Sequence, residues 1–196
     1  RAVFSIQAAV CRAFREFLQG EGFTEIHTPK LGRAGAEGGS SQFRLDYFGR
    51  KAVLAQSPQL YKQAMVGVFE RVYEIGPVFR AEKHATQRHL NEYTSLDLEM
   101  GFLHSFTDLM ALEQGFLRRL VALLRQEYAG ELALLGAELP DAEHIPAVRF
   151  DEAKRLAAEA YGYAIREPYD LEPEEEQHIG RYAKEVWGSD FVFVTH

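Results

Sequence analysis

The stretch that decides the fold is residues 78–100, VFRAEKHATQRHLNEYTSLDLEM, which contains two extended segments joined by a charged turn. In the second segment, apolar side chains alternate with polar ones. The two rows are Thr94, Leu96, Leu98 and Met100, and Tyr93, Ser95, Asp97 and Glu99. Because successive side chains of a strand point to opposite faces, the pattern predicts a packing face and a polar face. In the first segment, Arg80 and Glu82 share one side in the same way.

The turn between the segments is rich in cations. Residues 83–92 carry Lys83, His84, Arg88 and His89. This density of hydrogen-bond donors suits an anion such as a polyphosphate, and the turn could close over a nucleotide. Taken alone, the alternation favours an ordinary exposed hairpin with a solvated polar face, and periodicity does not decide between the two interpretations.

The literal sequence of this stretch is more specific. FRAE at residues 79–82, RHLNE at 88–92 and SLDLE at 95–99 closely resemble motif 2 of class II aminoacyl-tRNA synthetases, in the form of the archaeal-type aspartyl branch. The resemblance implies an α+β fold in which an antiparallel sheet, flanked by helices, holds ATP and an amino acid. It also implies that Arg80 is catalytic and binds both the substrate carboxylate and the α-phosphate.

The resemblance assigns further nucleotide contacts. Glu82 matches the adenine contact of the family, and Arg88 and His89 would approach the triphosphate. Leu90 would offer a backbone contact, and Tyr93 falls where related motifs stack an aromatic ring on adenine. Mg²⁺ is expected with the ATP, with its ligands mainly in a C-terminal part beyond these residues, so no metal ligand is assigned here. The seven histidines and Cys11 show no metal-ligand spacing, so we predict no structural zinc.

A second set of residues matches the amino-acid pocket. AEGGS at residues 36–40 resembles the family's flipping loop, in which Glu37 would meet the substrate ammonium group together with Asp97. SPQLYKQ at 57–63 matches the segment in which Lys62 would pair with the side-chain carboxylate of aspartate and Gln59 would hold polar groups. From spacing alone, the glycine-rich loop also fits a surface linker, and Gln59 and Lys62 fit a polar helix surface. The expected selectivity rests on Lys62 losing its counter-charge when it faces an asparagine amide.

The N-terminal part predicts a helix followed by a strand. Residues 2–19 repeat apolar side chains at helical spacing, and Gly20 is suited to end the helix. The helix, the strand at 24–27 and Pro29 together resemble motif 1, which builds the dimer interface in the family. A helix packed on its own core is the alternative; with the resemblance, we expect a homodimer.

The rest of the chain predicts further helices and strands. Hairpin strands are expected at 43–48 and 51–55 around Gly49, a helix capped by Ser57 with Pro58 in its first turn, and a strand at 71–75 bent by Gly76 and Pro77. Ser105 and Asp108 predict a cap for a helix to residue 127, with a buried leucine stripe. A connection is expected at 129–147, helices at 150–161 and 174–187, and a strand from 191. The acidic run at 172–176 is interpreted as a solvated helix start without function.

Composition limits the class of protein. The 196 residues are 46% hydrophobic, with no long apolar run and a single cysteine, which predicts a soluble cytoplasmic protein without an internal disulfide or membrane contact. The formal charge of −7 argues against RNA binding by bulk attraction, so any RNA contact must be local. We expect residues 1–196 to form a single, incomplete catalytic domain, without an N-terminal OB-type anticodon-binding domain and without the C-terminal motif 3 segment.

The resulting hypothesis is an ATP-dependent aspartate–tRNA ligase, a homodimer that makes aspartyl-adenylate and charges tRNA(Asp), or both tRNA(Asp) and tRNA(Asn). Two other hypotheses stay open. One is an asparaginyl-tRNA synthetase or a tRNA-independent asparagine synthetase on the same scaffold. The other is a synthetase-like subunit that performs no chemistry; the presence of Arg80, Glu82, Arg88, Lys62 and Glu37 together argues against it.

Overall fold

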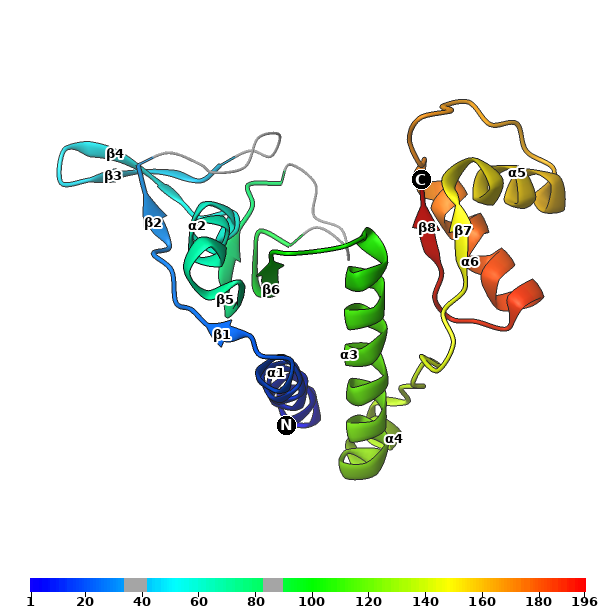
Figure 1. Cartoon of the computed structure of the whole chain (residues 1–196), viewed down its shortest axis with the longest axis horizontal. Coiled ribbons are helices and arrows are strands. Elements are labelled where there is room, and N and C mark those ends of the chain that lie inside the picture. Colours follow the sequence, from blue (N-terminus) through cyan, green and yellow to red (C-terminus); the bar gives the residue numbers. More distant parts are fainter. Residues whose placement is uncertain (34–41, 83–89) are drawn as a thin grey trace. The chain divides into compact units, whose positions relative to one another are not determined.

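The computed structural model describes residues 1–33, 42–82 and 90–196. Its internal contacts divide the chain into two compact units, Val10–His104, and Arg1–Ala9 with Ser105–His196. Figure 1 shows the order of helices and strands along the chain. Among the described residues, no helix combines the length and apolar character that crossing a bilayer requires.

The unit Val10–His104 is built on the predicted antiparallel pair. Strand β5 (Arg71–Phe79) pairs antiparallel with β6 (Glu92–Met100) along its whole length, and β1 (Thr24–Glu25) pairs parallel with its other edge. The strand expected at 71–75 is longer than predicted: β5 continues through Gly76 and Pro77, and each of these residues keeps a partner on β6. The first segment also ends earlier than expected, at Phe79, so Arg80 and Glu82 follow the strand instead of belonging to it.

Helix α1 (Ala2–Gly20) confirms the predicted amphipathic helix, and its inner side packs on β5. The Phe14 ring meets Tyr73 edge to face at 5.9 Å between centroids. Arg15 then donates two hydrogen bonds to Glu25, of 2.9 and 3.0 Å, and the Tyr73 hydroxyl donates a third of 3.0 Å. The Arg15 bond holds the Glu25 pKa below its usual value, whereas burial and the bond to Glu25 raise the pKa of Tyr73 to about 12.

A second small sheet follows in the same unit. Strand β4 (Arg50–Leu54) lies between β2 (Leu31–Gly32) and β3 (Arg44–Tyr47), antiparallel to both. The β3–β4 hairpin confirms the prediction, and its two loop residues, Phe48 and Gly49, have φ angles of 48° and 74°.

Helix α2 (Gln59–Phe69) joins the two sheets along the chain. Its N-cap is Pro58 and not Ser57 as predicted, because the chain becomes helical one residue later than the cap pattern suggested. The Ser57 hydroxyl still accepts a 3.1 Å hydrogen bond from the Gln59 amide, so it satisfies one of the free donors at the helix start.

In the other unit, the long helix α3 (Phe106–Glu127) has the predicted capping box of Ser105 and Asp108. The predicted leucine stripe is only partly correct: Leu123 and Leu124 are buried, but Leu109 is 38% exposed. A short helix α4 (Ala129–Leu135) occupies part of the stretch expected to be a connection, and it ends at Gly136 in the left-handed conformation. The alanine and leucine residues there are good helix formers, a signal that the proline nearby obscured.

The last elements form a small α/β cluster. Strands β7 (Ala147–Arg149) and β8 (Phe193–Thr195) pair in parallel, and helices α5 (Phe150–Tyr161) and α6 (Pro173–Trp187) pack through Ala157 and Ile179. The acidic run at 172–176 was predicted to be solvated, and this is wrong for Glu175. This residue is buried, at 2% exposure, and pairs with Lys154 at 2.7 Å. Lys154 also donates to the carbonyls of Glu167 and Asp170.

Candidate active site

The register of β5 and β6 gathers polar groups on one face of the sheet. Opposite residues of an antiparallel pair share a face, and the pairs here are Glu74 with Asp97, and Gly76 with Ser95. Tyr93 and Glu99 continue the same row on β6. The structure therefore confirms the predicted polar face and adds Glu74 to it.

Lys62 lies at this face and is held by two carboxylates. Its ammonium group is 2.5 Å from an Asp97 oxygen and 3.4 Å from a Glu99 oxygen. The three side chains are 13%, 17% and 30% exposed, so water screens these pairs only in part. Ser95 donates a 3.3 Å hydrogen bond to the other Asp97 oxygen, which fixes the orientation of that carboxylate.

This arrangement corrects one premise of the selectivity argument. A lysine facing a neutral amide was expected to lose its counter-charge, yet Asp97 and Glu99 already supply two negative charges. The physical reason is the helix position: Lys62 on α2 reaches β6, 35 residues further along the chain, where these carboxylates project. A bound ligand must therefore exchange with existing ion pairs and does not fill an empty charge site.

A buried carboxylate next to this group was missed from the sequence. Glu74 is 3% exposed and accepts hydrogen bonds from the Thr28 amide and hydroxyl, both 2.7 Å, and from Lys30 at 2.8 Å. The Lys30 ammonium also lies 3.3 Å from the position that a Cβ on Gly76 would occupy. An available signal was the acidic residue between Tyr73 and Ile75 in an apolar strand, since a buried carboxylate needs partners.

The predicted nucleotide residues are described in part. Arg80 is half-buried, and its amide donates a 2.9 Å hydrogen bond to the Asn91 carbonyl, which continues the β5–β6 pairing by one step. Glu82 is half-buried and its amide bonds back to the Arg80 carbonyl at 2.8 Å. Tyr93 is half-buried on β6.

The other predicted site residues divide into two groups. Leu90 is 56% exposed just before β6, and Gln59 is half-buried one helical turn before Lys62. Glu37, Arg88 and His89 lie outside the described residues. Within the described ranges, no group of three or more histidine, cysteine, aspartate or glutamate side chains is placed to hold a metal ion.

Comparison with known proteins relates this geometry to a family. The family model "tRNA synthetases class II (D, K and N)" matches residues 1–196. The chain belongs to this class II synthetase family. The prediction made from motifs 1 and 2 is therefore confirmed at the level of the family and of its α+β fold.

Curated relatives of this class II chain include two named aspartate–tRNA(Asp/Asn) ligase. Those of Deinococcus radiodurans and Thermus thermophilus are each 54% identical over 196 residues, which cover all of this chain and 45% and 46% of the relatives. A Pyrococcus horikoshii aspartate–tRNA(Asp) ligase is 41% identical, covering 98% of this chain and 44% of that protein. The chain thus spans less than half the length of these relatives.

Solved structures agree on the fold. Asparaginyl-tRNA synthetase from Pyrococcus horikoshii, complexed with asparaginyl-adenylate, superposes with a TM-score of 0.83 at 30% identity, covering 92% of this chain and 42% of that one. Aspartyl-tRNA synthetase from Entamoeba histolytica gives 0.77 at 32% identity, covering 97% and 36%. Since enzymes named for two amino acids share the class II fold, the choice between aspartate and asparagine depends on side chains in the pocket.

Proposed function

We propose that the full-length protein carrying this chain activates L-aspartate with ATP, forming aspartyl-adenylate, and transfers the aspartyl group to tRNA. The observation that carries the proposal is the ion-paired cluster of Lys62, Asp97 and Glu99 on the polar face of a class II sheet. Aspartate carries both an ammonium group and a second carboxylate, so it can replace both halves of the Lys62–Asp97 pair at once. The names of the relatives support the same amino acid.

Binding in this scheme is an exchange of ion pairs. The side-chain carboxylate of aspartate takes the Lys62 ammonium, and the α-ammonium group takes Asp97. The α-carboxylate, the one remaining charge of the substrate, is left to Arg80. Glu37 is proposed as the second carboxylate at the ammonium group, and Gln59 holds the remaining polar groups. Glu99 keeps Lys62 in position during the exchange, because it contacts the same ammonium group.

The chemical step requires positioning and positive charge. An oxygen of the substrate α-carboxylate attacks the α-phosphorus of ATP, and the bond from that phosphorus to the bridging oxygen of pyrophosphate breaks. Negative charge grows on the phosphoryl oxygens, and the planar guanidinium of Arg80 can donate paired hydrogen bonds to the carboxylate and the phosphate. The protein supplies no nucleophile of its own.

The remaining nucleotide contacts are proposals of the same kind. Glu82 binds adenine, Tyr93 stacks on it, Leu90 offers a backbone contact, and Arg88 and His89 approach the triphosphate. Mg²⁺ bound to ATP would neutralise phosphate charge, and no step above depends on it.

The proposed partners follow from the reaction. They are tRNA(Asp), or both tRNA(Asp) and tRNA(Asn), and a second copy of the protein across the motif 1 region of α1 and β1. The proposed location is the cytoplasm, where charged tRNA is consumed.

An asparaginyl activity is the second candidate, and one observation favours it. Lys62 already has two protein counter-charges, so a neutral amide can bind without leaving an unpaired ammonium group.

Amino-acid-dependent ATP–pyrophosphate exchange distinguishes the candidates. The full-length protein is assayed with aspartate, asparagine and no amino acid, without tRNA. The proposal expects exchange with aspartate at least a hundredfold faster than with asparagine. Preference for asparagine would establish the second candidate, and exchange with neither amino acid would support a subunit without adenylate chemistry.

A further inference from the structure

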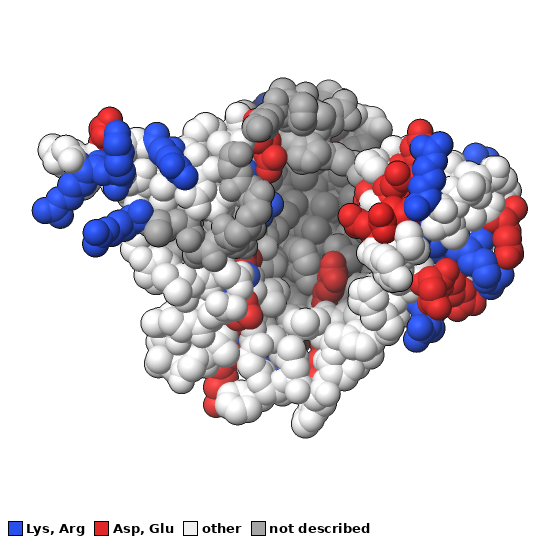
Figure 2. Space-filling model, turned by 90° about the horizontal axis from the view of Figure 1, so that it is seen from above, with Lys and Arg blue, Asp and Glu red and all other residues white. Residues whose placement is uncertain are grey.

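The small sheet of β2, β3 and β4 carries a positively charged surface away from the polar face of β5 and β6. Four cationic side chains, here called the basic hairpin surface, are exposed on it. They are Arg33, Arg44, Arg50 and Lys51. Figure 2 shows lysine and arginine atoms grouped around the β3–β4 hairpin, which Figure 1 labels. None of the predicted catalytic or pocket residues belongs to it.

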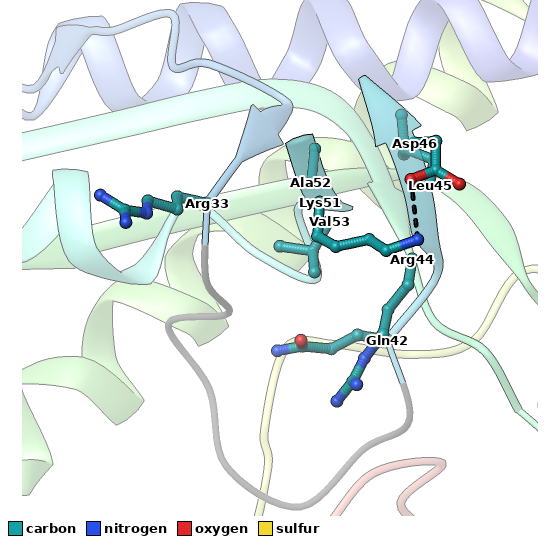
Figure 3. A pocket seen from close by; sticks show the side chains of 8 residues that line it. All are labelled: Arg33, Gln42, Arg44, Leu45, Asp46, Lys51, Ala52 and Val53. Atoms are coloured by element: carbon teal, nitrogen blue, oxygen red, sulfur yellow. Dashed lines mark hydrogen bonds and ion pairs between the residues drawn. The ribbon is translucent and has the colours of Figure 1, made fainter. Parts of the chain in front are cut away.

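The surface is hollowed and keeps most of its charge. Residues Arg33, Arg44 and Lys51 line a hollow of about 470 Å³ with Gln42. Figure 3 shows that Lys51 points to Asp46, with which it pairs at 2.7 Å, while Arg33 extends away from them. Within the described ranges, no carboxylate pairs with Arg33, Arg44 or Arg50. Four cations against Asp46 leave a local charge of +3 on a chain whose formal charge is −7.

The residue at the tip of the hairpin, Phe48, contributes no buried contact and has an unfavourable backbone conformation. Phe48 is 91% exposed and has a φ of 48°, in the left-handed region that bulky residues avoid. A two-residue hairpin loop with positive φ at both positions favours Asn-Gly, so phenylalanine is disfavoured here both by its backbone conformation and by its contact with water. Its ring packs edge to face on Tyr47, which is 48% exposed, with 4.8 Å between centroids.

We infer that the basic hairpin surface, with Phe48 and Tyr47 at its tip, is a binding site for the backbone and an unpaired base of RNA. Arginine and lysine side chains neutralise phosphates, and an exposed aromatic ring stacks on a base of any sequence. The local charge of +3 favours a polyanion such as RNA. Arginine and aromatic side chains are also enriched where proteins contact each other, and the sedimentation measurement described below separates that outcome. Naming tRNA as the RNA rests on the proposed function; the affinity of the surface for RNA does not.

The test measures tRNA affinity of the full-length protein by fluorescence anisotropy, using an unmodified tRNA transcript at several salt concentrations. One variant combines Arg44→Gln with Arg50→Gln, and a second carries Phe48→Asn. The matched control combines Arg155→Gln with Arg181→Gln, which removes two charges from exposed helix positions that are 55% and 59% exposed. ATP–pyrophosphate exchange without tRNA is measured on every variant.

The variant with Arg44→Gln and Arg50→Gln is expected to bind tRNA about tenfold more weakly at 0.1 M salt. The slope of its log Kd for tRNA against log salt concentration is expected to be lower by about 1.5, whereas the control variant should change neither quantity. Phe48→Asn is expected to bind at least about fivefold more weakly while its Tm stays equal or rises, because asparagine suits the turn. Exchange is expected to be unchanged in all variants, since no variant residue belongs to the proposed pocket.

Two results would overturn the inference. The first is that the variant with Arg44→Gln and Arg50→Gln binds tRNA with the same affinity and the same salt dependence as the control variant. The other is a change in sedimentation mass of the hairpin variants with no change in tRNA affinity, which would identify the surface as a contact between copies. If the unaltered protein shows no amino-acid-dependent exchange, the proposed function fails separately, and the RNA titration still decides this inference.

Discussion

Replacing Lys62 by methionine is expected to remove most aspartate-dependent ATP–pyrophosphate exchange. Lys62 lies 2.5 Å from Asp97 and 3.4 Å from Glu99, and its side chain is 13% exposed. The variant leaves two carboxylates facing each other, and they repel a substrate that carries two carboxylates of its own. Removing one partner of a buried, hydrogen-bonded charge pair costs about 2–5 kcal/mol. At 1.4 kcal/mol per tenfold, kcat/KM for aspartate falls about 30- to 4,000-fold.

The assay needs a control for folding and for general loss of charge. Lys184→Met serves as the control, because Lys184 pairs with an aspartate, Asp190, as Lys62 does, but it is 60% exposed and lies on α6. It is expected to retain exchange within about twofold, because exposed ion pairs contribute about 0–1 kcal/mol. Thermal unfolding followed by circular dichroism confirms that both variants are folded. A folded Lys62→Met protein with exchange near that of the unaltered protein would refute the pocket assignment.

Three further variants test other parts of the account. Arg80→Ala is expected to fold normally and to lose adenylate formation, and its release of pyrophosphate with aspartate measures this; retained activity would exclude Arg80 from the chemistry. Lys154→Met is expected to lower the free energy of unfolding by about 3–5 kcal/mol in urea titrations, because it leaves the Glu175 charge buried alone, and an unchanged midpoint would contradict the observed pairing. Arg15 lowers the pKa of Glu25 in the folded protein below its unfolded value of about 4.5. The pair therefore stabilises the fold fully at pH values above about 4.5, and this stabilisation is lost as the pH falls through the pKa of Glu25 in the folded protein. Glu25→Gln should therefore weaken the pH dependence of the unfolding free energy below pH 4.5, and an unaltered dependence would remove Glu25 as its source.

Local sequence signals predicted the elements that position the site. Alternation predicted β6, helical spacing predicted α1, and the Ser105 and Asp108 pattern predicted the start of α3, because each depends on neighbours within a few residues. The family resemblance supplied the α+β architecture, which pattern alone left open. Where local signals competed, as at Gly76 and Pro77, the pairing with β6 prevailed and β5 continued to Phe79.

Contacts between distant segments could not be predicted in the same way. Glu74 and Thr28 are 46 residues apart, and Lys62 and Asp97 are 35 apart, so neither pairing has a local sequence signature. The buried Glu175 was hidden in an acidic run typical of a solvated helix start, because the sequence does not reveal that Lys154 on α5 reaches it. In each case a buried charge acquired a partner from another element, as burial requires.

The central claim is that Arg80 binds the reacting phosphate while Lys62 selects the acidic side chain. A crystal structure of the full-length protein with a non-hydrolysable aspartyl-adenylate analogue tests it most directly. The account predicts the Arg80 guanidinium within hydrogen-bond distance of the α-phosphate, and the Lys62 ammonium on the side-chain carboxylate of the ligand. A nucleotide bound away from Arg80, or a Lys62 side chain that contacts only Asp97 and Glu99 with aspartate seated, would contradict it.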